Sequence, residues 1–160
     1  GDIGCYTLGA LPPFKALASC VDMGASITMA KGAADAGLFP SVAVIGDSTF
    51  THSGMTGLLD AVNDKSNITV VISDNLTTGM TGGQDSAGTN KLEAICLGLG
   101  VEPEHVRVVV PLPKNMPEIT RILKEEIDYP GVSVIIPRRE CIQTAARHAR
   151  EAKKLKEENK

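Results

Sequence analysis

The stretch Ile45–Gln84 reads IGDSTFTHSGMTGLLDAVNDKSNITVVISDNLTTGMTGGQ and decides the predicted fold. Two short apolar runs, Val42–Ile45 and Ile68–Ser73, have the length and composition of buried β-strands, and a helix-like segment separates them. Polar residues end both runs: Gly46-Asp47 follows the first and Asp74-Asn75 the second. A strand–helix–strand unit of this kind predicts two parallel strands, so both polar pairs are expected at the same edge of a sheet.

The side chains of Asp47 and Asn75 are the candidate ligands at that edge. Ligands of open α/β sheets bind at the carboxyl ends of the strands. A carboxylate and an amide oxygen are hard ligands of the kind that Mg²⁺ takes, and this ion completes its shell with water and phosphate oxygens. The pair therefore predicts a metal–diphosphate site. Each signal also has a simpler interpretation, because Gly-Asp after a strand is typical of a turn in which Asp caps a helix.

Helices and strands alternate along the rest of the chain. This alternation predicts the α/β fold class, an open parallel sheet with helices on both faces. Glu93 is expected to form a capping box with Thr89 or Asn90, and Asn115 is expected to cap the following helix. The expected strands are 41–45, 68–73, 106–110 and 132–136, and the expected helices are 23–34, 54–64, 90–99, 116–127 and 140–160.

Length and composition exclude several classes of protein. The 160 residues suit one domain, and the net charge of −3 gives no electrostatic case for nucleic acid. No apolar run approaches the roughly 18 residues that cross a bilayer, so no membrane partner is expected. The four cysteines form no CxxC or iron–sulfur spacing, which indicates reduced thiols in a cytoplasmic protein. We expect a domain over residues 1–141, a charged helix or connector over residues 142–160, and a longer parent protein.

The loop from Leu76 to Gly88 is rich in glycine and threonine and has few apolar anchors. Its sequence shows no pairing pattern, so little offsets the entropy cost of ordering it. Long loops in compact domains are usually functional or mobile. We therefore expect this loop to be mobile in the empty domain and ordered when a ligand is bound.

The spacing of the polar pairs resembles a known cofactor motif. Gly46-Asp47-Ser48 and the later Asn75 are similar to the thiamine diphosphate motif, in which Gly-Asp-Gly or Gly-Asp-Ser opens the site and an asparagine closes it one helix and one strand later. The usual closing pair is Asn-Asn, and Asp74 stands in the place of its first member. The resemblance implies that Asp47, Asn75 and the backbone carbonyl of Thr77 hold the metal.

Further segments make the resemblance more specific. GDIGCYTLG at residues 1–9, MGASI at 23–27, GDSTFTHSG at 46–54 and TGGQ at 81–84 are similar to the diphosphate-binding domain of 2-oxoacid:ferredoxin oxidoreductases, above all to large subunits of the indolepyruvate type. The similarity covers most of residues 1–141. Two parts of that family have no counterpart in this sequence. These are the clustered cysteines of a ferredoxin-like segment and the pyrimidine-binding domain, whose glutamate activates the cofactor.

The resemblance implies roles for individual residues. Met23 would be the apolar wedge that keeps the cofactor bent, and Cys5 and His52 would be catalytic residues beside the thiazolium ring and the substrate. From the residues alone, a lone cysteine such as Cys5 is more often a small buried apolar side chain, and His52 is more often a capping or surface histidine. The implied cofactor-binding residues are Gly4, Cys5, Met23, Gly24, Gly46, Asp47, Ser48, Thr49, Asn75, Thr77, Gly79, Met80 and Thr81.

The implied activity is the oxidative decarboxylation of an aryl 2-oxoacid with thiamine diphosphate and Mg²⁺. Electrons would pass through iron–sulfur clusters on another segment to ferredoxin, and coenzyme A would complete an acyl-CoA product. The implied partners are the pyrimidine-binding domain and the small subunit of the same enzyme, in a homo-oligomer, and this domain alone is expected to be inactive.

Two alternatives remain at this level. One is the cofactor subunit of a non-oxidative decarboxylase, such as sulfopyruvate or phosphonopyruvate decarboxylase, although the GDIGC and TGGQ segments favour the oxidoreductase. The other is a binding module without catalysis, which the absence of the GxGxxG and GxxxxGK[ST] fingerprints disfavours. The identity of the 2-oxoacid does not follow from the sequence.

Overall fold

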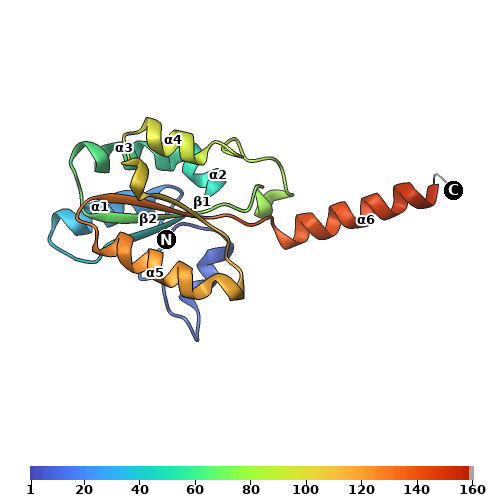
Figure 1. The fold of residues 1–160 in the computed structure, drawn as a ribbon, viewed down its shortest axis with the longest axis horizontal. Helices are drawn as coiled ribbons and strands as arrows, with labels where there is room; N and C mark the ends of the chain where they lie inside the picture. Colours follow the sequence, from blue (N-terminus) through green and yellow to red (C-terminus); the bar gives the residue numbers. More distant parts are fainter. Residues whose placement is uncertain (159–160) are drawn as a thin grey trace.

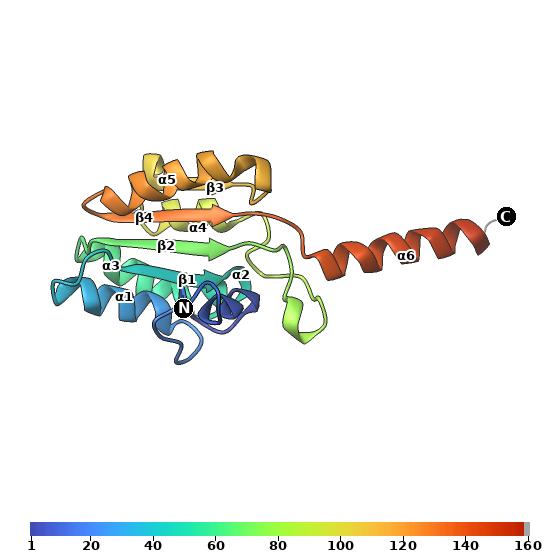
Figure 2. The same cartoon turned by 90° about the horizontal axis from the view of Figure 1, so that it is seen from below.

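The structure of the protein is a computed structural model that describes residues 1–158, apart from the side chains of Met80, His148, 151–153 and 155–158. Within this part of the chain, four parallel strands form one sheet in the order β1-β2-β4-β3 (Figures 1 and 2). The predicted parallel sheet is confirmed. Its strands are β1 (Val42–Gly46), β2 (Ile68–Ser73), β3 (Val106–Val109) and β4 (Val132–Pro137).

Helices cover both faces of this sheet, as predicted. On one face, α1 (Ala25–Asp35), α3 (Met55–Asn63) and α4 (Leu92–Gly98) contribute to the larger apolar cluster. On the other face, α5 (Met116–Asp128) packs a smaller cluster against β3 and β4. The sheet is therefore shielded on both sides, which explains why its strands are continuous apolar runs instead of alternating ones.

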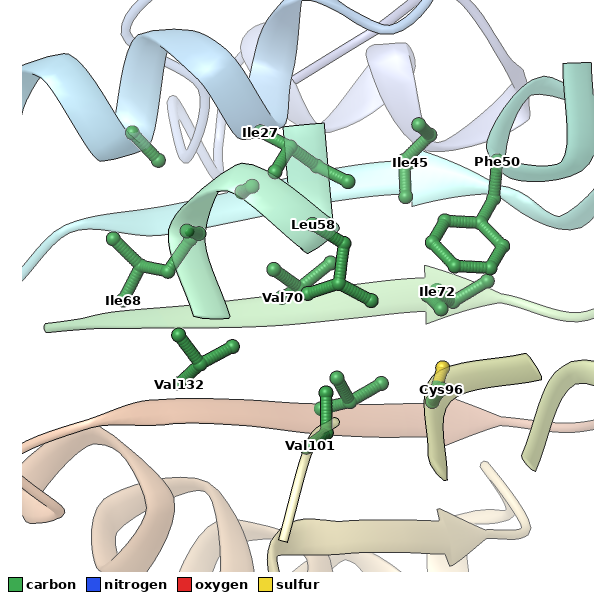
Figure 3. Packing of buried hydrophobic residues seen from close by; sticks show 14 of the residues in the cluster. Ile27, Ile45, Phe50, Leu58, Ile68, Val70, Ile72, Cys96, Val101 and Val132 are labelled. Carbon is green, nitrogen blue, oxygen red and sulfur yellow. The ribbon is translucent and has the colours of Figure 1, made fainter. Parts of the chain in front are cut away.

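The larger core depends on the alternation of side chains along β2. Ile68, Val70 and Ile72 point into the cluster between the sheet and the helices, where they meet Leu58 of α3 (Figure 3). Thr69 points to the opposite face and donates its hydroxyl to the backbone carbonyl of Glu126 at 3.1 Å. The β-branched residues that fill β2 suit such a pleated and fully buried surface.

The helix after β1 begins earlier than predicted. The expected start was residue 54, but α2 (Asp47–Thr49), a π-helical turn (Phe50–Gly54) and α3 follow one another without a break. Phe50 is completely buried in the core and anchors this early start. In the sequence, Phe50 is a single aromatic residue among small polar ones, so no helical periodicity of apolar residues marks this early start. Helical insertions of the π type are frequent at functional sites.

The predicted side-chain caps are wrong. Helix α4 begins after Lys91 without any side-chain cap, and Glu93 is paired with Arg138 instead of closing a capping box. Asn115 does precede α5, but its amide donates to the carbonyl of Val110 at 2.9 Å instead of capping the helix. A local pattern cannot foresee the partner of Glu93, because Arg138 lies 45 residues away. The partner of Asn115 lies only 5 residues away, and this bond takes the place of the cap.

Helix α6 (Ile142–Glu158) extends away from the sheet at the end of the chain (Figures 1 and 2). Its sequence predicts an inward apolar stripe of Ala145, Ala149, Ala152 and Leu155; Ala145 is partly buried, but Ala149 is exposed. The side chains of Ala152 and Leu155, also expected in that stripe, lie outside the described part. None of the described helices is both long enough and apolar enough to cross a membrane.

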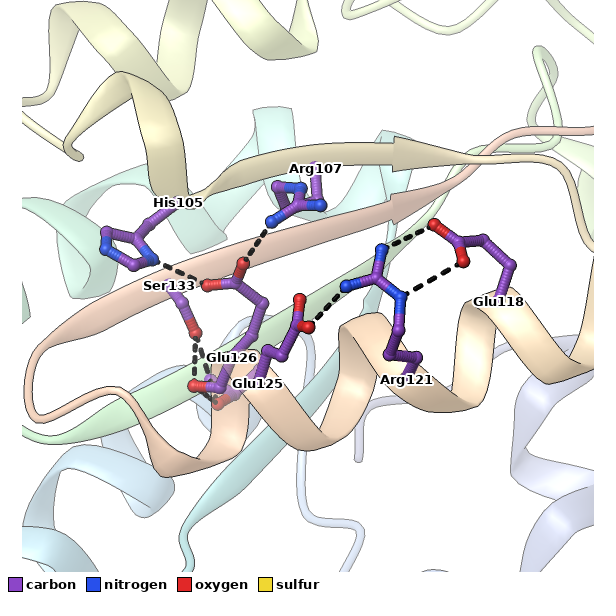
Figure 4. Close-up of polar contacts among 8 residues, drawn as sticks. His105, Arg107, Glu118, Arg121, Glu125, Glu126 and Ser133 are labelled. Carbon is purple, nitrogen blue, oxygen red and sulfur yellow. Dashed lines mark hydrogen bonds and ion pairs between the residues drawn. The ribbon is translucent and has the colours of Figure 1, made fainter.

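A buried carboxylate links α5 to the strands at the amino edge of the sheet. Glu126 is 2 % exposed, and its carboxylate contacts Arg107 at 3.0 Å and His105 Nδ1 at 2.8 Å (Figure 4). The ring of His105 stacks on Tyr129 with centroids 3.4 Å apart. A buried charge of this kind depends on its partners, because an uncompensated one is costly.

We predict that Arg107→Met lowers the free energy of unfolding by about 2 kcal/mol, because it leaves the buried Glu126 carboxylate without its guanidinium. Urea unfolding would measure the change. The matched control is Arg121→Met, which removes only the exposed ion pairs with Glu118 and Glu125 and should have a much smaller effect. Equal losses in both variants would contradict the assigned role of Arg107.

Candidate functional site

The carboxyl ends of β1 and β2 bring the candidate metal ligands together, as the sequence predicts. Gly46 pairs with Ser73 in the parallel register, so Asp47 and Asp74-Asn75 follow at neighbouring positions. Asp47 is also the first residue of the helical segment that follows β1. Asp47, Asn75 and Thr77 all line one cavity of about 520 Å³. This volume is within the range of small-molecule and cofactor sites.

Asp47 is the least satisfied polar group in this cavity. Its side chain is almost fully buried, with 3 % of the residue exposed, and its Oδ2 atom has no hydrogen-bond partner among the described residues. Burial raises the pKa of the carboxyl to about 6, and the nearby charge of Asp74 adds to this increase. The buried hydroxyl of Ser86 acts in the opposite direction, although its geometry does not make a hydrogen bond. A cation at Oδ2 would supply the missing partner.

The second and third proposed ligands lie in a tight turn after β2. The side-chain Oδ1 of Asn75 accepts the backbone N–H of Thr77 at 3.1 Å. Between them, Leu76 adopts a positive φ of 60°, which is uncommon for a residue with a side chain. The described residues contain no group of three or more histidines, cysteines, aspartates or glutamates suited to a metal. A metal held by the predicted ligands would have one carboxylate, one amide and one carbonyl, a donor set that suits Mg²⁺ with water and phosphate oxygens.

Most of the residues predicted to bind the cofactor line this cavity. Gly24 does not line it, although its neighbour Met23 does, and His52 is exposed and lies outside the lining. Their roles in binding and catalysis remain predictions. Met80 belongs to a short 3-10 turn (Gly79–Thr81), but its side chain lies outside the described part. The predicted residues in the lining are Gly4, Cys5, Met23, Gly46, Asp47, Ser48, Thr49, Asn75, Thr77, Gly79 and Thr81.

Asp2 positions the amino-terminal side of the cavity, and the sequence did not reveal this role. Its completely buried carboxylate accepts the backbone N–H groups of Gly24 at 2.9 Å and Ser26 at 2.8 Å, at the start of α1. Its own N–H donates to the carbonyl of Val44 in β1 at 3.0 Å. Gly24 has a φ of 95°, and a Cβ there would lie 2.7 Å from Ser53 Oγ, so glycine is required. Asp2 thus fixes the segment that carries Cys5 beside the segment that carries Met23.

Tyr6 is a further lining residue that the sequence analysis missed. Its hydroxyl accepts the backbone N–H of Gly46 at 3.2 Å, directly before Asp47. Burial and the charge of Asp2 raise the pKa of the phenol, so it remains neutral. A Cβ on Gly4 would lie 2.4 Å from the tyrosine ring, which explains a glycine at this position. The only available signal was one aromatic residue within a segment of small residues.

The loop after Asn75 is more ordered than its sequence indicated. Thr78 and Gln84 form an antiparallel bridge, with Thr78 N–H donating to the Gln84 carbonyl at 2.7 Å. The hydroxyl of Thr77 donates to the same carbonyl, and Arg147 of α6 donates to the carbonyl of Gly82 at 3.0 Å. The expectation of a loop without pairing is therefore wrong. Ser48 and Thr78 also share a hydrogen bond of 2.8 Å between their hydroxyls, which joins this loop to the helix start.

The raised pKa of Asp47 gives a prediction for the metal-free protein. Its value of about 6 exceeds the value of about 3.9 in an unfolded chain, so the ionised carboxylate opposes folding. Stability relative to Asp47→Asn is therefore greatest below about pH 4 and falls as the pH rises through about 6, by roughly 3 kcal/mol. Urea unfolding of both proteins in a chelator at several pH values checks this. A difference that does not change with pH would contradict it.

The sequence of this chain is similar to those of known proteins. Over 88 % of its length, the chain is 35 % identical to the indolepyruvate oxidoreductase subunit IorA of Pyrococcus horikoshii and 38 % identical to that of Archaeoglobus fulgidus. These matches cover 25 % and 24 % of the relatives, so the chain spans about a quarter of their length.

Solved structures share the fold at lower sequence identity. A thiamine diphosphate-dependent 4-hydroxybenzoylformate decarboxylase of Rhodococcus jostii RHA1 is 23 % identical with a TM-score of 0.55, covering 74 % of this chain and 23 % of that one. A benzoylformate decarboxylase of Polynucleobacter necessarius is 21 % identical with a TM-score of 0.56 and the same coverage.

A family model provides the most direct assignment. The model described as the thiamine pyrophosphate enzyme, C-terminal TPP binding domain, matches residues 2–136. The matched range contains both polar pairs, the cavity and all four strands except the last residue of β4. The chain therefore belongs to the family of C-terminal TPP binding domains of thiamine pyrophosphate enzymes.

Proposed function

We propose that this chain is the diphosphate-binding part of a thiamine diphosphate-dependent 2-oxoacid:ferredoxin oxidoreductase that acts on an aryl 2-oxoacid such as indolepyruvate. The observation that carries the proposal is the buried Asp47 Oδ2 without a partner, which shares one cavity with Asn75 and Thr77. The names of the relatives, subunits of indolepyruvate oxidoreductase, support the substrate class.

In this proposal, Asp47, Asn75 and the carbonyl of Thr77 hold Mg²⁺, and the metal holds the diphosphate of the cofactor. The helical segment that starts at Asp47 presents free backbone N–H groups, which favour phosphate. Thiamine diphosphate, when bound, supplies a nucleophilic carbon and an electron sink for the decarboxylation of a 2-oxoacid. This chain binds and orients the cofactor.

The remaining proposed contacts come from the amino-terminal side of the cavity. Met23 is half exposed at the lining and is placed to support the rings of the cofactor. Cys5 is exposed in the same cavity, within reach of a ligand that fills it. We retain His52 as a proposed catalytic residue of the complete enzyme, although it does not line the cavity of this chain.

Exposed apolar side chains between residues 3 and 23, two of which line the cavity, support the proposal of a partner domain. Several large apolar side chains near the amino terminus are exposed, up to 75 % for Phe14. Apolar residues grouped on a surface usually mark an interface. We propose that the pyrimidine-binding domain and the small subunit of a homo-oligomeric, cytoplasmic enzyme cover this surface. Iron–sulfur clusters elsewhere in that enzyme, ferredoxin and coenzyme A complete the proposed reaction. The exposed residues of this surface are Ile3, Leu8, Leu11, Phe14, Val21 and Met23.

The observations favour this function over a non-oxidative decarboxylase. The decarboxylases among the solved structures are 21–23 % identical to the chain, a level that indicates only a common fold. The oxidoreductase subunits are 35–38 % identical over most of the chain. The GDIGC and TGGQ segments lie at the cavity lining and at the loop bridge, respectively.

We predict that the chain binds thiamine diphosphate only with Mg²⁺ and that Asp47→Ala abolishes this binding. Removing the carboxylate takes away the one charged ligand of the metal. Isothermal titration calorimetry with and without Mg²⁺ measures the effect. Asp128→Ala, a change of an exposed residue at the end of α5, is the control and should bind like the wild type. Unchanged, metal-independent affinity in Asp47→Ala would refute the proposed function.

We further predict that the cofactor orders the loop of residues 76–88. The bridge between Thr78 and Gln84 already holds the base of its tip, so the largest gain in protection is expected at residues 79–83. Amide hydrogen exchange with and without thiamine diphosphate and Mg²⁺ measures the change, and the core strand β2 serves as an internal control. Equal protection of the tip in both states would show that the loop is preformed.

A further inference from the structure

A second buried carboxylate lies at the edge of the sheet that carries Asp47. Asp74 is 2 % exposed and directly precedes Asn75. It has no place in the proposed metal coordination, yet its charge acts on Asp47. A buried carboxylate beside another one is costly unless a cation compensates it. The role of Asp74 and of its partner therefore needs an explanation.

The partner of Asp74 is Arg138, which immediately follows β4. Arg138 Nε donates to Asp74 Oδ2 at 2.5 Å. The two terminal nitrogens of the same guanidinium donate to the two carboxylate oxygens of Glu93 at 2.8 and 2.6 Å. Three donors of one planar group are thus used at once, and this geometry fixes the guanidinium in space. Lysine could not reproduce this arrangement.

The other oxygen of Asp74 shapes the turn that carries the metal ligands. Asp74 Oδ1 accepts the backbone N–H of Leu76 at 3.2 Å, and Asn75 Oδ1 accepts that of Thr77 at 3.1 Å. The positive φ of Leu76 is unfavourable for a residue with a Cβ. Hydrogen bonds from aspartate and asparagine side chains to the backbone two residues later stabilise such turns. The position of the Asp74 carboxylate therefore helps to determine where Asn75 and Thr77 lie.

The backbone around Arg138 holds the same turn from the side of β4. Asp74 N–H donates to the carbonyl of Pro137, and Arg139 N–H donates to the carbonyl of Asp74. Cys141 N–H donates to the carbonyl of Asn75 at 3.1 Å. The chain that leaves β4 thus continues the sheet alongside Asp74 and Asn75. These bonds fix the backbone, and Arg138 fixes the side chain that closes the turn.

We propose that Arg138 is a positioning residue of the metal site, and this inference rests on the proposed function. Arg138 holds the carboxylate of Asp74, and Asp74 in turn holds the turn that presents Asn75 and Thr77 toward Asp47. Its positive charge also compensates the charge that Asp74 adds beside Asp47. Asp74 and Arg138 therefore act as a unit. An asparagine at position 74, as in the usual Asn-Asn pair, would add no charge, so no arginine would be required to compensate it.

The test is a double-mutant cycle read out as affinity for thiamine diphosphate in the presence of Mg²⁺, measured by calorimetry on this chain. Arg138→Met is expected to lower the affinity by at least about tenfold, a size typical of residues that orient metal ligands. Adding Asp74→Asn to Arg138→Met is expected to restore the affinity to within about threefold of the wild type. A purely structural role of Arg138 through Glu93 would give no such rescue.

Two further variants keep the test decisive. Arg121→Met removes an arginine with exposed ion pairs on α5 and is expected to bind like the wild type. Arg138→Lys covers the case in which Arg138→Met does not fold, and it is expected to lose part of the affinity because it lacks the planar fork. Full affinity in Arg138→Met or Arg138→Lys, or a double variant no better than the single one, would overturn the inference. A wild-type chain that does not bind would instead refute the proposed function, and the inference with it.

Discussion

Parallel pairing of β1 with β2 is the constraint on which the site depends. With Gly46 opposite Ser73, the chain leaves both strands at the same height, so Asp47 and Asn75 must meet. The pairing of β2 with β4 continues beyond the strands through the bridge between Asp74 and Arg138. A shift of one residue in either register would turn each of these side chains to the other face of the sheet. The register of the core strands therefore determines the chemistry at their ends.

The two buried carboxylates at the carboxyl edge of the sheet, Asp74 and Asp47, differ in their hydrogen-bond partners. Asp74 receives a guanidinium and a backbone N–H, so its charge is compensated within the chain. Asp47 is buried just as deeply, yet one of its oxygens has no partner among the described residues. Such an unfavourable group persists only because the surrounding structure overdetermines it, here through the buried Phe50 that anchors the helix start. Asp74, whose carboxylate has its partners within the chain, shapes the site. The unpaired oxygen of Asp47 can accept a further partner such as a cation.

Sequence predicts the parts of this structure that local patterns determine. The apolar run Ile68–Ser73 and the polar residues at both strand ends were sufficient to predict the parallel sheet and to place Asp47 beside Asn75. The parts that were missed depend on contacts between distant residues. Glu93 pairs with Arg138 instead of capping α4, and the hydroxyl of Tyr6 meets the N–H of Gly46. Tertiary partners such as these override local capping preferences, and no spacing in the sequence encodes them.

The segments that resemble the cofactor motif contain two kinds of residue with different physical roles. Some line the cavity, as Cys5 and Asp47 do, while Asp2 lies outside its lining and joins α1 to β1. The cavity is thus built from segments that are distant in the sequence and are held together by long-range contacts, hydrogen bonds among them. A ligand that contacts all of these segments binds the folded chain alone, so its binding free energy adds to the stability of the fold. Asp47 Oδ2, which has no partner within the described chain, would then contribute to that added stability, which makes ligand binding and local order two aspects of one equilibrium.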